Sequence, residues 1–314
     1  MTYFSIITPL FNKANYISET ISSVRDQKMT NWEMIIVDNG STDHGPAIAR
    51  QYAGLDSRIN FIEFSRKQGP GAARNAGLYI AIGQWVVFLD SDDLIQPDFL
   101  AHRYEIATRN NDVQIIVGKW EEFEDITPEK RVEKYPTQWL GDTSKIVEAA
   151  IAYAPWALHA AIVRRDFLME KHQWVEELDQ FASEDTAFWF RVIQDAKIEW
   201  CNNSGALYRV HTFDSRNAIR DPVRWITSVT RIIENNFLFL QRCQIEPTRS
   251  QYENTFRVLE SLYRLAIEYK LQEEQIFLEK QIFQFMKLAP LSIGIITRRL
   301  LGLKFFNLMR YAIK

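Results

Sequence analysis

The sequence predicts an α/β fold in which a mostly parallel sheet is flanked by helices and followed by a C-terminal helical extension. In the first hundred residues, short apolar runs rich in Val, Ile and Phe alternate with longer segments whose apolar residues recur every three or four positions. This alternation is typical of parallel strands joined by crossover helices. After Pro222 the patterns are helical through Tyr311, which predicts the extension.

The expected elements follow one another in a regular order. Short apolar runs bounded by Pro, Asn, Asp or Gly predict buried strands over residues 4–8, 33–37, 59–63 and 85–89. Helical spacing predicts crossover helices over residues 16–27, 46–52 and 72–82. Beyond them we expect a helix and a strand over 97–119, a charged surface excursion over 121–138, helices near 144–153 and from Glu184, and a strand over 198–210. Breaks are expected at Pro247 and Pro290, and a boundary near residue 221.

The composition describes a folded protein without a global basic field. With 46% hydrophobic and 13% aromatic residues the chain can bury a large core, and a net charge of −3 disfavours nucleic acid as a partner. Two cysteines, Cys201 and Cys243, are too few for a disulfide framework or a zinc cluster and suit a reducing compartment. The first ten residues lack the positive charge of a signal peptide, and no apolar run is long enough to cross a membrane.

Polar loops follow three of the expected strands, at residues 8–12, 38–43 and 90–93. In open parallel sheets, ligands bind beyond the carboxyl ends of the strands. The third loop contains three aspartates, Asp90, Asp92 and Asp93, which repel one another unless a cation or several donors neutralise them. Mg²⁺ or Mn²⁺ together with substrate phosphates fits such a loop. In isolation the same segment would also fit a solvated acidic loop, but its position after a buried strand favours the metal interpretation.

Four motifs occur in a fixed order, and they are SIITPLFN at 5–12, IVDNGSTD at 36–43, GAARNAG at 71–77 and VFLDSDD at 87–93. Together they resemble the opening of the family 2 glycosyltransferases, in which the last motif is the Asp-x-Asp motif. This resemblance implies the GT-A fold of nucleotide-diphospho-sugar transferases. It further implies a catalytic domain over 1–220, with a nucleotide-sugar-binding half over 1–100 and an acceptor half over 101–220, and a helical region over 221–314.

The resemblance also implies roles on the donor side. Asp92 is expected to coordinate the metal that bridges the diphosphate, and Asp90 to contact the ribose or a metal-bound water. The nucleotide base is expected beside Pro9, Asp38, Asn39 and Asp43. Relatives commonly have two aspartates where this chain has Asp-Asn, and the second often binds the uracil N3–H. The amide oxygen accepts the same bond without a charge, so a uridine donor is expected while another base becomes more credible.

Arg74 in the third motif fits two interpretations. Its guanidinium either offsets the charge of the diphosphate or pairs with a carboxylate of the neighbouring loops, and the structural pair is slightly favoured. The glycines that precede it, Gly69 and Gly71, do not form a dinucleotide-binding motif, because a third glycine is missing and the segment does not leave the first strand.

A second signature lies in the acceptor half. An inverting transfer needs a base that takes the proton of the acceptor hydroxyl. The segment SEDTAFWFR at 183–191 resembles the family signature in which a Glu-Asp pair opens a helix. By that resemblance Asp185 is the base and Glu184 orients the acceptor or the loop. The same residues would also suit an ordinary helix N-terminus, where the helix dipole favours acidic side chains.

Three further residues carry open alternatives. YRVH at 208–211 resembles a late segment of many relatives, so His211 is expected either to touch the metal or the diphosphate or to be a hydrogen-bonded structural residue. Trp156 and His159 either line the acceptor side, where aromatic rings stack on sugars, or pack in the core.

The C-terminal segment from Lys280 to Lys314 has no acidic residue, while its basic residues are interspersed with Leu, Ile and Phe. Such a basic amphipathic segment either lies on an anionic membrane surface, which suits a lipid-linked acceptor, or packs on the catalytic domain or on the second subunit of a homodimer.

The sequence thus predicts a metal-dependent, inverting glycosyltransferase that moves a sugar from a nucleotide diphosphate, UDP above all, to a saccharide or lipid-linked acceptor. The resemblance implies the bacterial cytosol or the inner face of the inner membrane, and the assembly of a surface polysaccharide or lipopolysaccharide. A nucleotidyltransferase is disfavoured, because residues 8–12 do not form a glycine-rich, lysine-containing triphosphate loop. A catalytically silent sugar- or nucleotide-binding module of the same fold is the other alternative, and the presence of Asp90, Asp92 and Asp185 speaks against it.

Overall fold

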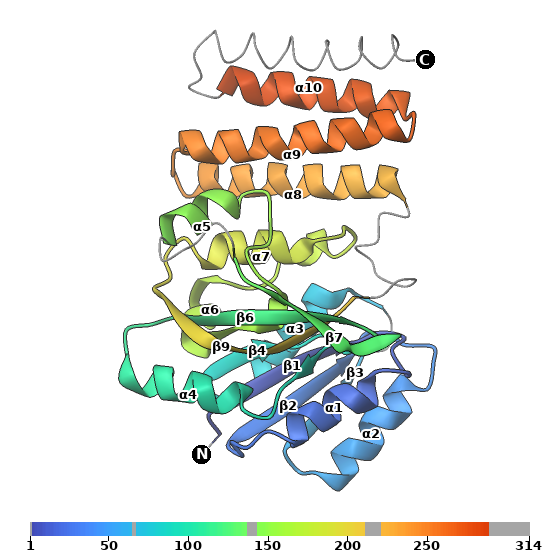
Figure 1. Ribbon diagram of the computed structural model, residues 1–314, viewed down its shortest axis with the longest axis vertical. Coiled ribbons are helices and arrows are strands. Elements are labelled where there is room, and N and C mark those ends of the chain that lie inside the picture. Colours follow the sequence, from blue (N-terminus) through green and yellow to red (C-terminus); the bar gives the residue numbers. More distant parts are fainter. Residues whose placement is uncertain (1, 65–66, 137–142, 211–220, 289–314) are drawn as a thin grey trace.

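A computed structural model describes residues 2–64, 67–136, 143–210 and 221–288 (Figure 1). Its first half contains four parallel strands, as predicted, and they are β1 (Phe4–Leu10), β2 (Trp32–Asp38), β3 (Ile59–Glu63) and β4 (Trp85–Phe88). The crossover helices between them are α1 (Ile17–Arg25), α2 (Gly45–Leu55) and α3 (Pro70–Ile80). In Figure 1, α3 lies on the opposite side of these strands from α1 and α2. Helices on both faces bury β1, β2 and β4 almost completely, which explains why these strands are rich in apolar residues, whereas the edge strand β3 is partly exposed.

The second half makes the sheet mixed, where a mostly parallel sheet was expected. β8 (Ala161–Arg164) pairs antiparallel with β4 and with β6 (Ile115–Glu124), whereas β9 (Ile198–Arg209) pairs parallel with β6. The two-residue β5 (Leu94–Ile95) pairs antiparallel with β9. β8 was not predicted, because an apolar run of four residues is too short for periodicity to identify as a strand.

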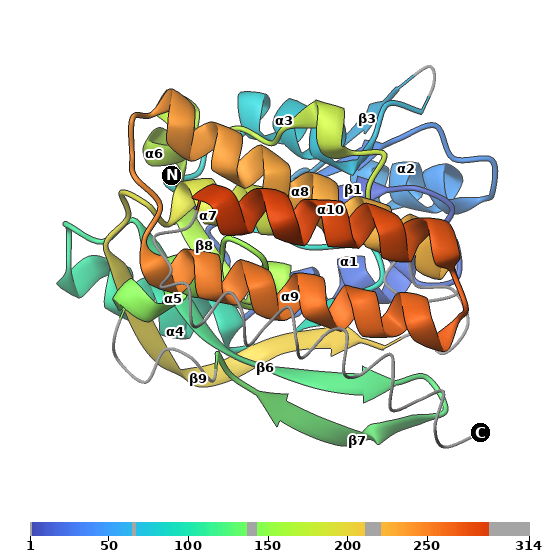
Figure 2. The ribbon, with the colours of Figure 1, turned by 90° about the horizontal axis from the view of Figure 1, so that it is seen from above.

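Residues 121–138 were expected to form a surface excursion, and the structure corrects this expectation. β6 continues to Glu124 and forms an antiparallel hairpin with β7 (Thr127–Lys134). The charged residues pair across the hairpin, for example Lys119 with Glu133 at 2.8 Å. β7 is an edge strand that pairs only with β6 in the described part of the chain, so it tolerates a proline, Pro128. Figure 2 shows the hairpin at the outer edge of the sheet.

Helices beyond the sheet form a second block. α7 (Glu184–Val192) lies between the sheet and α8 (Pro222–Arg242), and α9 (Arg249–Glu268) and α10 (Gln272–Leu288) lie farther out (Figure 1). The break at Pro247 is confirmed, because Thr248 caps α9 with a capping box. The break between α9 and α10 was not predicted, and there Lys270 adopts a φ of 58°. Pro290 and most of the basic segment lie outside the described residues. No described helix is long and apolar enough to cross a membrane.

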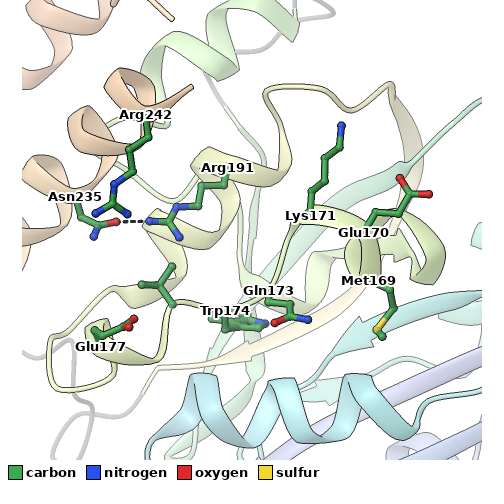
Figure 3. Close-up of a pocket in the computed structure, with 10 residues that line it drawn as sticks. Met169, Glu170, Lys171, Gln173, Trp174, Glu177, Arg191, Asn235 and Arg242 are labelled. Carbon is green, nitrogen blue, oxygen red and sulfur yellow. Dashed lines mark hydrogen bonds between the residues drawn. The ribbon is translucent and has the colours of Figure 1, made fainter. Parts of the chain in front are cut away.

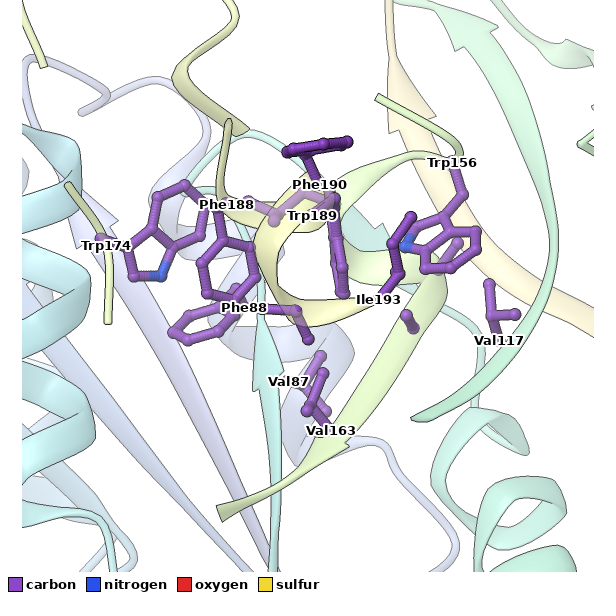
Figure 4. Packing of buried hydrophobic residues seen from close by; sticks show 14 of the residues in the cluster. Val87, Phe88, Val117, Trp156, Val163, Trp174, Phe188, Trp189, Phe190 and Ile193 are labelled. Atoms are coloured by element: carbon purple, nitrogen blue, oxygen red, sulfur yellow. The ribbon is translucent and has the colours of Figure 1, made fainter. Parts of the chain in front are cut away.

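Aromatic residues of α7 hold this helix against the sheet (Figure 4). The ring of Phe188 stacks on Trp174 at 4.1 Å and meets Phe88 of β4 edge-on, while Trp189 meets Trp156 edge-on at 5.1 Å. One buried apolar cluster extends from β1 to α10, so a single core supports both blocks. The proposed boundary near residue 221 lies one residue before α8, and the division into domains stays a prediction.

The remaining helices are short or peripheral. α4 (Phe99–Arg109) packs against β9, and α5 (Thr143–Ala149) packs against α9. α6 (Arg165–Lys171) follows β8 directly, and two single-turn helices, η1 (Leu158–Ala160) and η2 (Glu176–Leu178), flank this pair in sequence. The residues from 172 to 183, which include η2, lead from α6 to the start of α7 and form one wall of the candidate site.

Candidate active site

The loops that follow β1 and β2 are tied into one unit at the carboxyl end of the sheet. The side-chain oxygen of Asn12 accepts a hydrogen bond from the Thr42 backbone N–H at 2.8 Å. Asp43 accepts one from the N–H of Ala14 at 2.8 Å and one from its own loop. Pro9 pairs with Val37 in the strand register, so it lies beside the start of the second loop. The predicted base-binding residues are therefore neighbours, as their positions after adjacent strands required.

Asp38 and Asn39 are both buried, and both shape the loops. The Asp38 carboxylate accepts hydrogen bonds from the N–H groups of Gly40 and Ser41. The side-chain oxygen of Asn39 accepts hydrogen bonds from the N–H groups of Gln68 and Gly69, at 2.8 and 3.0 Å. A neutral amide oxygen thus closes the loop before α3 without burying a charge. Contact of either side chain with a nucleotide base stays a prediction.

Arg74 joins the two signatures of the sequence. Its side chain is 2% exposed, and its guanidinium donates to Asp90 at 2.6 Å and to Glu184 at 3.1 Å. The ring of Trp174 lies 4.3 Å from the guanidinium carbon. Burial alone would lower the pKa of Arg74, but the two carboxylates outweigh it and raise the pKa above its ordinary value. The structural ion pair expected for Arg74 is confirmed, whereas its contact with a diphosphate stays a prediction.

The buried side chain of Asp93 fixes the Asp-x-Asp loop, residues 90–93, to the rest of the protein. Its carboxylate is buried, accepts a hydrogen bond from the Arg209 N–H at 2.8 Å and lies 3.2 Å from Nδ1 of His159. Burial raises the pKa of Asp93, His159 opposes this effect, and the nearby Asp92 and Asp90 raise it further. His159 is fully buried, so of its two alternatives the structure shows the core position.

Arg209, two residues before His211, ties the same loop to distant parts of the chain. Its Nε donates to the backbone carbonyl of Asp92 at 2.7 Å. Its other guanidinium nitrogens bind Glu19 of α1, at 2.6 Å, and Asp125 of the β6–β7 turn. The end of β9 therefore fixes the backbone of the residue that was predicted to hold the metal. His211 itself lies outside the described residues.

Asp92 faces a cation in the structure, because Nζ of Lys13 lies 2.7 Å from its carboxylate. No cluster of three or more potential metal-ligating side chains exists within the described residues. A Mg²⁺ or Mn²⁺ site of the kind that takes one or two carboxylates and fills its shell with substrate phosphates needs no larger cluster. Asp92 and the partly exposed Asp90 fit that donor set, since both offer hard oxygen ligands next to one another.

The second signature begins with a strained residue. Ser183 adopts a φ of 62°, a left-handed conformation that is uncommon for residues other than glycine. Directly after it, Glu184 is buried and points to Arg74, whereas Asp185 is partly exposed and accepts a hydrogen bond from the Thr186 N–H. Acidic side chains are favourable at a helix N-terminus, where the helix dipole is positive. The two acidic residues therefore differ in their surroundings. Glu184 is buried and bound to Arg74, whereas Asp185 is more accessible.

Asp179 is a site residue that the sequence analysis missed. Its two carboxylate oxygens accept hydrogen bonds from the N–H groups of Gly71 and Ala72, at 2.8 and 3.0 Å, at the first turn of α3. A Cβ on Gly69 would lie 2.1 Å, and one on Gly71 2.5 Å, from a carboxylate oxygen of Asp179. These glycines therefore allow the acidic side chain to cap the helix that carries Arg74. The paired glycines were a signal for this close approach.

Trp156 does not line a surface that could meet an acceptor. It is 2% exposed and packs on Trp189, so the core alternative is correct. Trp174, by contrast, was not singled out in the sequence, although it covers the guanidinium of Arg74. Its role depends on the loop from 172 to 183, whose path no local pattern specifies.

Comparison with known proteins is consistent with this fold. The model of glycosyl transferase family 2 matches residues 5–170. The chain is 30% identical to the putative glycosyltransferase EpsH of Bacillus subtilis, over 88% of this chain and 80% of EpsH. It is 45% identical to the putative teichuronic acid biosynthesis glycosyltransferase TuaG of B. subtilis, over 32% of this chain and 40% of TuaG.

Solved structures show the same architecture. Residues 1–349 of S. aureus TarS in complex with UDP match with a TM-score of 0.68 at 21% identity, over 92% of this chain and 81% of that chain. The mannosyltransferase PcManGT from Pyrobaculum calidifontis, in complex with GDP-Man and Mn²⁺, matches with a TM-score of 0.52 at 15% identity, over 91% and 85%. The fold and the acidic site define a GT-A glycosyltransferase. The chain belongs to glycosyl transferase family 2.

Proposed function

We propose that this glycosyltransferase takes a sugar from a nucleoside diphosphate, UDP above all, and transfers it with inversion to a hydroxyl of a saccharide or lipid-linked acceptor. The main observation in support of the proposal is that the guanidinium of Arg74 donates hydrogen bonds to both Asp90 and Glu184. The Asp-x-Asp loop and the start of α7 therefore face one another. TarS has been solved with UDP and with UDP-GlcNAc, which supports UDP as the nucleotide here.

The proposed transfer reaction uses Asp185 as the base that takes a proton from the acceptor, while the nucleoside diphosphate leaves. The acceptor oxygen attacks the anomeric carbon, and the bond from that carbon to the diphosphate oxygen breaks, its electron pair leaving with the nucleotide. The proton of the acceptor hydroxyl passes to the carboxylate of Asp185. Because Glu184 is held by Arg74, Asp185 is the carboxylate of the pair that can approach an acceptor.

Metal dependence is part of the proposal. Asp92, together with Asp90, would hold Mg²⁺ or Mn²⁺, and His211 is a further candidate ligand. When bound, the ion would neutralise charge that develops on the leaving diphosphate. Lys13 would then exchange its ion pair with Asp92 for one with a phosphate oxygen. PcManGT, which was solved with GDP-Man and Mn²⁺, supports a divalent cation in this fold.

The acceptor and the location complete the proposal. We place the reaction on the cytoplasmic side of a bacterial envelope, in the assembly of a surface polysaccharide or lipopolysaccharide. The name of TuaG, which assigns that protein to teichuronic acid biosynthesis, supports a polysaccharide product. The basic segment at 280–314 would hold the enzyme at the membrane face or in a homodimer.

The membrane role of this segment is tested by deletion. Deleting residues 289–314 should reduce binding to anionic liposomes, and unchanged binding would count against the membrane role.

The donor is tested first by thermal shift. UDP, GDP, dTDP, CDP and CMP are each added with and without Mn²⁺ or Mg²⁺ to the wild type and to Asp92→Ala. A ligand that binds the native state raises the melting temperature, so a metal-dependent shift with UDP that is lost in Asp92→Ala supports the proposal. The absence of any nucleotide shift in the folded wild type would contradict it.

A further inference from the structure

A cavity lies between α6, α7 and α8. It has a volume of about 690 Å³ and opens between the end of α6, the segment before η2 and the C-terminal parts of α7 and α8 (Figure 3). Trp174 and Met169 form apolar parts of its wall, and the other lining side chains are mostly polar or charged. A volume of this size admits a sugar residue with its substituents.

Two arginines from different helices converge on this cavity. Figure 3 shows Arg191 of α7 and Arg242 of α8 on either side of Asn235. Arg191 donates a hydrogen bond to the side-chain oxygen of Asn235, which is a neutral partner. Among the described residues, neither arginine forms an ion pair, and Nε of Arg191 is buried without an acceptor. Burial lowers the pKa of Arg191, and Arg242 lowers it further, against the opposing effect of Glu177.

The cavity is locally basic in a protein that is acidic overall. Lys171 lines it in addition to the two arginines, whereas Glu170 and Glu177 are its acidic residues. The whole chain carries a net charge of −3. The positive charges of Arg191 and Arg242 repel one another, and an anion bound between them would attract both. Planar guanidinium forks bind phosphate or carboxylate oxygens in a bidentate manner, which a neutral sugar could not use.

This cavity adjoins the candidate reaction centre. Trp174 lines the cavity, and its ring also packs on Arg74, the residue that binds Asp90 and Glu184. α7 begins with Glu184 and carries Arg191 seven residues later, which is about 10 Å along the axis at the rise of an α-helix. An oligomeric acceptor that presents a hydroxyl to Asp185 could therefore place a neighbouring unit at the cavity.

We propose that the cavity binds an oxyanion, a phosphate or a carboxylate, carried by an acceptor saccharide next to the unit that receives the sugar. Arg191 and Arg242 grip the oxyanion, and Trp174 and Met169 contact the ring that bears it. This inference rests on the proposed function, because it assigns the cavity to the acceptor of that reaction.

Calorimetric titrations in metal-free buffer test the inference. The probes are methyl glucuronide, glycerol phosphate, inorganic phosphate and the neutral methyl glucoside. They are titrated into the wild type, Arg242→Gln, and Arg257→Gln as a matched control. Arg242 and Arg257 are both exposed helical arginines, but Arg257 lies on α9 outside the cavity. Because Arg242 is exposed, its replacement leaves the core intact.

We expect the wild type and Arg257→Gln to bind methyl glucuronide or glycerol phosphate more tightly than methyl glucoside. Arg242→Gln should weaken that binding about tenfold, as the loss of a charged hydrogen bond does. Preference for the glucuronide identifies a carboxylate, and preference for glycerol phosphate a phosphate. No binding by the wild type, equal binding by Arg242→Gln, or binding of inorganic phosphate alone would overturn the inference. The UDP thermal shift on the same samples tests the proposed donor separately.

Discussion

Arg74 and Glu184 lie 110 residues apart in the chain, yet their buried side chains meet through a 3.1 Å hydrogen bond. The same guanidinium binds Asp90. One cation thus sets the distance between the loop proposed to hold the donor and the helix proposed to carry the base.

Replacing this cation should destabilise the fold. Arg74→Met removes the guanidinium that both Glu184 and Asp90 bind, and removal of one member of a buried pair costs about 3 kcal/mol. Arg109→Met is the control, because Arg109 forms an exposed pair with Glu105 and should change the free energy of unfolding by less than about 0.5 kcal/mol. Urea denaturation measures both. Equal unfolding free energies for the two variants would show that the buried pair is not needed for stability.

Asp185→Asn should abolish most of the transfer activity. A general base contributes about 10²- to 10⁴-fold to a rate, whereas the affinity for the nucleotide should not change. Asp166→Asn is matched to it, since Asp166 is an exposed aspartate in the first turn of α6 and serves only as a helix N-terminal acid. Rates of sugar transfer and dissociation constants for UDP are measured for both. Full activity of Asp185→Asn would assign this side chain to the helix terminus alone.

Lys13→Met should change the metal requirement. The ammonium of Lys13 neutralises Asp92 at 2.7 Å, with 21% of its side chain exposed. Removing a partly exposed partner of this kind is worth roughly 1 kcal/mol, so Mn²⁺ should bind up to about fivefold more tightly. The Mn²⁺ concentration at half-maximal activity is the measurement. An unchanged or higher value would mean that Lys13 does not compete with the cation for Asp92.

Replacement of glycine by alanine should have opposite effects on stability at two positions. Gly71→Ala places a methyl group 2.5 Å from the Asp179 carboxylate, and such overpacking costs about 1–3 kcal/mol. Gly54→Ala, near the end of α2, meets nothing within 4 Å, and should stabilise the helix by up to about 1 kcal/mol. Melting temperatures of the two variants should therefore move in opposite directions. A Gly71→Ala protein as stable as the wild type would exclude the close contact with Asp179.

Asp56 gives a pH-dependent test. A side-chain hydrogen bond from Arg58 lowers its pKa from 3.8 to about 2. The folded pKa lies below the unfolded one, so the stabilisation is present above pH 3.8 and is lost as the pH falls towards 2. The melting temperature of Asp56→Asn should be lower than that of the wild type at pH 5, and the difference should shrink towards pH 2. Arg58→Gln should reproduce this profile, and a difference that is independent of pH would contradict the assignment.

The sequence predicted those strands and loops that can be recognised from a short stretch of neighbouring residues. Strands β1 to β4 are short segments rich in apolar residues, and the DSDD and SED segments lie directly at the ends of elements, so their places could be derived. The sheet's second half was predicted only in part. β9 and the start of β6 lie where strands were expected. β8 and β7 were missed, because β8 is four residues long and the proline of β7 is tolerated only at an edge.

Contacts between distant segments were the other limit of prediction. Nothing near Asp179 in sequence shows that it caps α3, about a hundred residues earlier. The pairing of Lys13 with Asp92 and of His159 with Asp93 likewise depends on how loops meet in space. Arg74 was an exception, because its position among three acidic loops already favoured an ion pair.

Because contacts of the candidate site join residues that are far apart in sequence, they can form only late during translation. The ribosome releases the first hundred residues first, but Asp179, Glu184 and Arg209 emerge about a hundred residues after the segments that they bind. Until then, Arg74 lacks one carboxylate and the backbone of the Asp-x-Asp loop is unsupported. A nascent chain therefore cannot hold the proposed donor site in its final geometry before residues 179 to 209 have emerged.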